Sequence, residues 1–226
     1  MIRNDIYEDL VDKIVSLKLQ PGEKISEIET SMYYHVSRTP IRDVFKKLED
    51  NQLVDIITHS GTFVSKIDLD FILDQVFIKY SCELEAMNEL SGKITDENLI
   101  YINQNIEKQK AIFDSYDLQS DDVAEKYFAL DNDLHLYLFK LINRESVLKK
   151  LFDIQPNYQR YRFMTFYRDK VYLDNLIKIH TDLIKCLQND NKNNLKKIIY
   201  EHNYSSLNGI KELVNLKRDY FINIKS

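Results

Sequence analysis

The most regular local pattern in the chain lies at residues 36–49, which read Val36-Ser37-Arg38-Thr39-Pro40-Ile41-Arg42-Asp43-Val44-Phe45-Lys46-Lys47-Leu48-Glu49. Ser37 is a good helix N-cap, and Pro40 falls in the first turn, where its missing N–H costs little. Apolar side chains recur at helical spacing and form one face. On another face, Arg38, Arg42 and Lys46 recur every four residues. The stretch predicts an amphipathic helix with a basic outer stripe.

The flanking residues extend this helix into a known supersecondary plan. Apolar side chains at helical spacing predict a first helix over 4–18, and Pro21-Gly22 ends it. A second short helix is expected from about Ser26 to Tyr34. After the basic helix, two β-rich runs at 53–57 and 62–65 predict a hairpin. Two helices, a turn, a basic helix and a hairpin indicate a winged helix-turn-helix.

Composition sets the wider frame. The 226 residues hold 31 basic and 36 acidic side chains, for a formal net charge of −5, and 44% of the residues are hydrophobic. Only 4 Gly and 3 Pro occur, which favours helices over a turn-rich β fold. The N-terminal segment carries acids where a signal peptide is apolar, and Cys82 and Cys186 predict no disulfide framework. We therefore expect a mainly α, cytoplasmic protein.

Four segments of the N-terminal region resemble the DNA-binding domain of GntR-family bacterial transcription regulators, in order: Leu19–Glu27, Val36–Arg42, Leu53-Val54 and Gly61–Val64. The resemblance implies that Ser37, Arg38, Thr39 and Arg42 meet operator phosphates and bases, with the wing at His59 and Gly61 near the minor groove. Lys46 extends the same basic stripe.

Four positions depart from the family pattern. Thr30-Ser31 stand where Leu-Ala is usual, Ile28 stands where many members have a basic residue, and His35 stands where Gly is usual in the turn. A residue other than Gly at position 35 is expected to need a positive φ. The alternative interpretation of the basic stripe is a solvated helix face without DNA.

From Asp68 on, we predict six or seven long helices in an antiparallel bundle, with breaks near Ser91-Gly92, 114–121, Asn143-Arg144 and 189–194. No strand alternation persists there. The sequence thus divides into residues 1–67, a winged helix-turn-helix domain, and residues 68–226, an all-helical domain.

Three of these helices carry an apolar stripe that ionisable residues interrupt: Phe128, Asp131, His135, Leu138 and Ile142; Leu173, Leu176, His180, Leu183 and Leu187; Leu195, Ile198, His202 and Gly209. A buried charge is costly unless it is paired or bound to metal. Asp131, His135, His180 and His202 would together suit Zn²⁺, Ni²⁺, Mn²⁺ or Fe²⁺. For any single histidine, a hydrogen-bonded core residue is the more common interpretation.

The same four residues, with Asn143 after the first pair, resemble the FCD ligand-sensing domain of the FadR-like subfamily. The resemblance implies a helical bundle that holds a divalent metal, with a small carboxylate effector completing its coordination. Arg162 stands about where such domains often have an arginine and could pair with the effector, although a surface arginine is at least as common.

These patterns predict a homodimeric repressor that binds a palindromic operator and senses a small carboxylate at the metal site. A dimer is expected because one winged helix reads only a half-site. Two alternatives stay open. One is a helical metalloenzyme, although no general base is apparent and the winged helix would have no role. The other is a DNA-binding regulator whose histidines are structural and which has no effector.

Overall fold

The computed structural model of the chain describes residues 2–115, 121–153, 156–166 and 170–224. These residues form two compact units. The first unit comprises residues 1–73, 154–164 and 210–226, and the second comprises 74–153 and 165–209. The predicted fold class, mainly α with a small wing after a helix-turn-helix, is confirmed.

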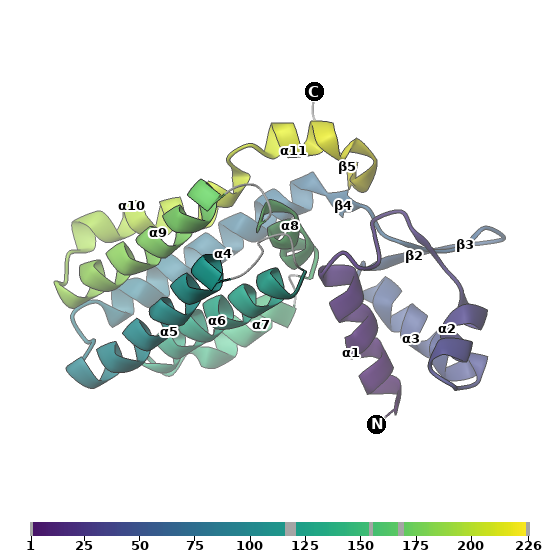
Figure 1. Ribbon diagram of the computed structural model, residues 1–226, viewed down its shortest axis with the longest axis horizontal. Helices are drawn as coiled ribbons and strands as arrows, with labels where there is room; N and C mark the ends of the chain where they lie inside the picture. Colours follow the sequence, from purple (N-terminus) through teal and green to yellow (C-terminus); the bar gives the residue numbers. More distant parts are fainter. Residues whose placement is uncertain (1, 116–120, 154–155, 167–169, 225–226) are drawn as a thin grey trace. The chain divides into compact units, whose positions relative to one another are not determined.

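The first unit begins with the predicted winged helix (Figure 1). Its elements are α1 (Ile2–Val15), β1 (Lys24–Ile25), α2 (Glu27–Tyr33), α3 (Arg38–Asp50), β2 (Val54–Ile57) and β3 (Gly61–Val64). The strands form an antiparallel sheet in the order β1-β3-β2, with Val54 opposite Val64 and Ile57 opposite Gly61. The hairpin was predicted; the edge strand β1 was not.

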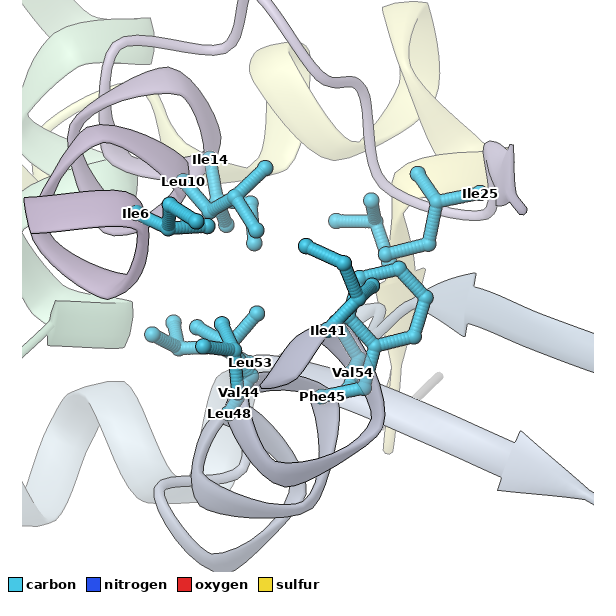
Figure 2. Packing of buried hydrophobic residues seen from close by; sticks show 11 residues of the cluster. Ile6, Leu10, Ile14, Ile25, Ile41, Val44, Phe45, Leu48, Leu53 and Val54 are labelled. Atoms are coloured by element: carbon cyan, nitrogen blue, oxygen red, sulfur yellow. The ribbon is translucent and has the colours of Figure 1, made fainter. Parts of the chain in front are cut away.

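A single apolar cluster holds the winged helix together (Figure 2). Ile6, Leu10 and Ile14 project from α1 toward the inner face of α3. That inner face consists of Ile41, Val44, Phe45 and Leu48, which are the residues that the periodicity predicts. Burial of this set leaves the basic side chains of α3 on the opposite, solvent side.

Three predicted local features concern the N-caps of α2 and α3 and the turn between these helices. Ser26 caps α2, and its side chain accepts a hydrogen bond from the backbone N–H of Glu29. Ser37 occupies the N-cap of α3 in extended backbone, but its hydroxyl makes no capping hydrogen bond. His35 has φ +53° in the turn before α3, as expected for a position that usually holds glycine. The turn therefore forms at some conformational cost.

The first unit also includes segments from later in the chain. The short strands β4 (Ile67–Asp68) and β5 (Phe221–Ile222) pair in parallel, so the expectation of helices alone beyond Asp68 was wrong for the C-terminal end. Helix α8 (Pro156–Phe166) contributes its residues up to Met164 to this unit, and α11 (Ile210–Leu216) belongs to it entirely. Whether residues 1–67 and 68–226 act as separate domains stays a prediction.

The second unit is helical. It contains most of α4 (Leu69–Leu90), together with α5 (Asp96–Ser115), α6 (Asp121–Lys140), α7 (Glu145–Asp153), α9 (Lys170–Gln188) and α10 (Lys192–Tyr204). Helix α5 packs on α6 and α9, and α9 packs on α10. Among the described residues, no helix has both the length and the hydropathy to cross a membrane.

Positive-φ residues mark three of the predicted helix breaks: Gly92 (+73°), Asn143 (+59°) and Asp190 (+48°). Each lies just beyond a helix end, where left-handed backbone terminates the helix. The fourth predicted break, at 114–121, falls between α5 and α6, and its residues 116–120 lie outside the described residues. Across two of these breaks, successive helices pack on each other: α6 on α7 and α9 on α10.

Candidate functional sites

The outer side of α3 is a basic surface of the first unit. Arg38 and Arg42 have side chains that are 56% and 65% exposed. Ser37, Thr39 and Lys46 are exposed as well. The predicted DNA-contacting residues of the helix therefore all lie at the surface. An exposed row of guanidinium and ammonium groups is chemically suited to phosphates and to guanine edges.

One carboxylate organises the two arginines of this surface. Glu27, the first residue of α2, accepts hydrogen bonds from Arg42 Nε (to Oε1) and Arg42 Nη2 (to Oε2), both at 3.1 Å. Arg38 Nη2 donates to Glu27 Oε2 at 3.3 Å. The hydrogen bonds from Arg42, helped by Arg38, hold the pKa of Glu27 below its usual range. Glu27 thus remains ionised and links α2 to α3.

The hairpin wing has a tip that only glycine fits well. Gly61 has φ +123°, and a Cβ added there would lie 2.7 Å from Lys24 Cε. His59, in the turn between β2 and β3, has φ +64° and is exposed. These two predicted wing residues therefore lie close together at the tip, with Lys24 beside Gly61.

The second predicted site is buried in the second unit. On α6, Asp131 and His135 are 5% and 3% exposed, and on α9, His180 is 1% exposed. On α10, His202 is 9% exposed. The residues predicted for the α6 and α9 stripes are all buried, although Ile142 lies in the turn just beyond the end of α6.

The stripe on α10 needs a correction. It consists of Leu195, Ile199, His202 and Asn203, whereas Ile198 is half-buried and Gly209 lies beyond the end of the helix. The prediction placed Ile198 and Gly209 on this face because the exact phase of a short stripe is poorly determined by four positions.

The three histidines converge. Their ligand-type nitrogens all lie within 4.8 Å of one another, so the three could hold a metal ion. Asp131 Oδ1 lies 3.2 Å from His180 Nε2 and 3.9 Å from His135 Nε2. Yet His135 Nε2, His180 Nε2 and His202 Nδ1 are buried atoms without a hydrogen bond of acceptable geometry in the described structure. Orphaned buried nitrogens that face one another fit a shared cation.

The opposite ring nitrogens of the histidines do have partners. His135 Nδ1 lies 3.0 Å from Glu83 Oε1, and His180 Nδ1 lies 3.1 Å from Gln109 Oε1. Partners of this kind on the outer ring nitrogen fix the tautomer and ring orientation of metal-ligating histidines. His135 and His180 are therefore held with Nε2 toward the shared centre.

Lys79 is the unexpected member of the cluster. It is 7% exposed, and its ammonium lies 2.8 Å from Glu83 Oε1 and 3.4 Å from His202 Nε2. Lys79 also donates to Asn203 Oδ1, and Asn203 Nδ2 donates to Glu83 Oε2 at 2.7 Å. The buried charge of Lys79 is thus neutralised by Glu83, as a buried ion pair requires.

Charge states follow from this arrangement. Burial opposes ionisation of Glu83, but Lys79, His135 and His202 hold the pKa of its carboxyl well below the usual range. Burial and the nearby Lys79 lower the pKa of His202 well below its usual range. His202 is therefore neutral near pH 7, and neutral imidazole is the form that binds metals.

Sequence reasoning missed four residues around the histidines: Lys79, Glu83, Gln109 and Asn203. Lys79 and Glu83 are four residues apart on α4, a spacing that usually indicates an exposed ion pair. Nothing in the sequence distinguishes this pair from a surface one. Arg162 lies on α8 in the first unit and donates to Gln159 Oε1 at 2.9 Å, so its expected role toward the effector stays a prediction.

Comparison with known proteins gives a family match over residues 2–64, to the model described as "Bacterial regulatory proteins, gntR family". The "HTH-type transcriptional repressor RspR" of Escherichia coli K12 is 25% identical over 221 residues, covering 97% of this chain and 93% of that protein. The "Nta operon transcriptional regulator" of Aminobacter aminovorans is 25% identical over 149 residues, 66% of each chain.

Solved structures support the fold over most of the chain. The structure described as "E. coli McbR/YncC" has a TM-score of 0.68 at 16% identity, covering 96% of this chain and 98% of that one. A transcriptional regulator GntR from Rhodococcus sp. RHA1 has a TM-score of 0.67 at 15% identity, covering 91% and 97%. At these identities the likeness concerns the fold alone.

Proposed function

We propose that this chain is a DNA-binding transcriptional regulator of the GntR family, and that it is a repressor controlled by a small carboxylate at a metal site. Two features of the chain support this proposal, one at its surface and one in its core. An exposed basic stripe lies on α3 in one unit, and three buried histidine nitrogens face one another in the other.

DNA binding is assigned to α3 and the wing. Arg42 and Arg38 are exposed and rigidly oriented by Glu27, and arginine can bind guanine in the major groove or a phosphate. Ser37, Thr39 and Lys46 lie beside the two arginines, where they can contact the phosphate backbone of the DNA. The wing tip carries His59 and Gly61. That RspR bears the name of a repressor supports repression as the outcome.

The second unit is assigned to the FCD type of the FadR-like subfamily. His135, His180 and His202 would hold a divalent metal such as Zn²⁺, Ni²⁺, Mn²⁺ or Fe²⁺, with Asp131 as the carboxylate ligand. The residues fit this group because the inward histidine nitrogens make no hydrogen bond of acceptable geometry in the described structure and Asp131 lies beside two of them. Glu83 and Gln109 lie against the opposite ring nitrogens of His135 and His180. When bound, the metal supplies open positions for an anionic ligand.

A homodimer follows from the geometry of recognition. One winged helix reads a half-site, and a two-fold symmetric protein matches a palindromic operator. A dimer of this chain would place two copies of α3 about one helical turn of DNA apart.

One rival has a specific observation behind it. Lys79, Glu83 and Asn203 already form a connected polar network, so the histidines could belong to a structural network without metal. A metalloenzyme is the other alternative, since an open metal position can activate water, and turnover of candidate carboxylates would identify it.

Selection from a random DNA pool with the full-length chain tests the proposal. We expect a palindromic sequence to be enriched, and its affinity to change when metal and a panel of small carboxylates are added. His180→Ala should abolish that response, whereas His35→Asn, which removes a histidine outside the cluster, should retain it. Failure to enrich any sequence contradicts DNA recognition; an operator affinity indifferent to metal and to every carboxylate contradicts control by the site.

A further inference from the structure

Glu27 is the one acidic residue in the described structure whose side chain pairs with both arginines of the α3 surface. Its side chain is 25% exposed, against 56% and 65% for Arg38 and Arg42. The carboxylate therefore lies beneath the two guanidinium groups on the surface that would meet DNA. A negative charge in such a place opposes phosphate binding, so its presence calls for an explanation.

The N–H groups of Arg42 that do not bind Glu27 explain why this carboxylate lies there. A guanidinium has five N–H donors, and Glu27 takes one from Nε and one from Nη2. Both donors of Nη1 and one of Nη2 remain. They form the outer edge of the fork, which can make two parallel hydrogen bonds to guanine O6 and N7. Pairing with Glu27 thus occupies one edge of the Arg42 guanidinium group and leaves the other edge available to a base.

Resting on the DNA-binding function proposed above, we propose that Glu27 is a positioning residue for sequence discrimination: it fixes the plane of Arg42 for base reading and lowers affinity for DNA of arbitrary sequence. Fixing the plane reduces the conformational entropy that a long side chain loses on binding a base. The negative charge acts on every duplex alike, because phosphates are present whatever the sequence. The two effects together raise the ratio of operator affinity to non-specific affinity.

The chain offers matched variants that separate geometry from charge. Glu27→Gln removes the charge and the strong pairing. Glu27→Asp keeps the charge but shortens the side chain, so the two-bond contact with Arg42 is lost. Glu29→Gln makes the same change in net charge on the same helix, and in the described structure Glu29 has no ion pair with Arg38 or Arg42.

The experiment measures the affinity of full-length protein for the selected operator and for a scrambled duplex, at several salt concentrations. For Glu27→Gln we expect tighter binding to the scrambled duplex, a log–log salt slope more negative by about one, and a specificity ratio lower by about fivefold or more. Glu27→Asp should lower the ratio mainly through weaker operator binding. Glu29→Gln should keep the wild-type ratio.

Three results would overturn the proposal: an unchanged ratio in Glu27→Gln, an equal loss in Glu29→Gln, or a wild-type ratio in Glu27→Asp. Thermal melting of each variant checks that the winged helix is intact, and should Glu27→Gln not fold, the Asp variant decides alone. If the wild-type chain itself prefers no sequence, the proposed function fails and this inference fails with it. If the wild type is selective and the variants equally so, only this inference fails.

Discussion

Arg42 combines exposure with a fixed orientation, because Glu27 binds its Nε and Nη2 while 65% of its side chain remains exposed. We predict that Arg42→Ala weakens operator binding by roughly 1–3 kcal/mol and leaves the fold intact, if this residue reads a base. A gel-shift titration measures the change. Arg144→Ala, an exposed arginine of the second unit, is the control, and equal affinity of Arg42→Ala and wild type would defeat the assignment.

Gly61 is a second single residue with a definite energetic prediction. Alanine at φ +123° is strained, and its Cβ would also meet Lys24 Cε at 2.7 Å. We expect Gly61→Ala to destabilise the wing by about 1–3 kcal/mol, measured by chemical denaturation. Adding Lys24→Ala removes the clash but not the strain. The double variant should therefore recover only part of the loss, and full recovery would show that backbone conformation contributes nothing.

Substitution of Glu83 tests the proposed metal site without removing one of its metal ligands. It lies 3.0 Å from His135 Nδ1 and pairs with Lys79. We predict that Glu83→Gln lowers metal affinity by about 10–100-fold, because outer partners orient ligating histidines. Glu85→Gln, an exposed acid on the same helix, should have no such effect. Metal titration that gives equal affinities for the two variants would speak against the role of Glu83.

At the scale of elements, α8 holds both ends of the wing hairpin within the first unit. Arg160 is fully buried and donates to Ser65 O at 2.5 Å, to Ser65 Oγ at 3.1 Å and to Asn157 Oδ1 at 2.7 Å. Asn157 in turn donates to Gln52 O, before β2, and Ser65 follows β3. Burial lowers the pKa of Arg160 to about 10, so it stays charged at neutral pH.

Removal of Arg160 should therefore loosen the wing. We expect Arg160→Met to cost about 1–3 kcal/mol of stability, because buried acceptors lose their donor, and to speed amide exchange over residues 61–65. Hydrogen-exchange measurements test this, with Lys66→Met, an exposed neighbour, as the control. Unchanged exchange in the wing would mean that α8 does not support it.

The elements differ in how far sequence predicts them. Helix α3 was predictable because a cap, a proline and an apolar face agree over fourteen residues of the quoted stretch. Strand β1 has two residues and β5 has two, so neither carries a periodicity that could be detected. Their formation depends on partners distant in the chain, Phe63 and Thr62 for β1. Tertiary pairing, which local patterns do not encode, determines such strands.

The buried cluster was predictable in part, because the helices that carry it also have a periodic apolar face. His135 and His180 interrupt apolar stripes, and stripes predict burial. The convergence of three helices on one point, and the burial of Lys79 and Glu83 beside it, arise from packing between α4, α6, α9 and α10. Sequence alone indicates the ligands but not their partners.

At the scale of the whole molecule, the proposed mode of action requires two copies. The predicted mass in solution is that of two 27.0 kDa chains, with or without operator, because a two-fold symmetric reader matches a palindromic site. Sedimentation equilibrium measures it. A monomeric mass in both conditions would contradict the dimer and the half-site geometry together.

We propose that the buried histidines form a metal site that controls DNA binding by this chain. Equilibrium titration of the metal-depleted full-length chain with Zn²⁺, Ni²⁺ and Mn²⁺, followed by elemental analysis, tests it most directly. The account predicts about one ion per chain, a rise in melting temperature that a chelator reverses, and loss of both in His180→Ala but not in His35→Asn. No bound ion with any of the three metals would contradict it, and the cluster would then be a buried polar network.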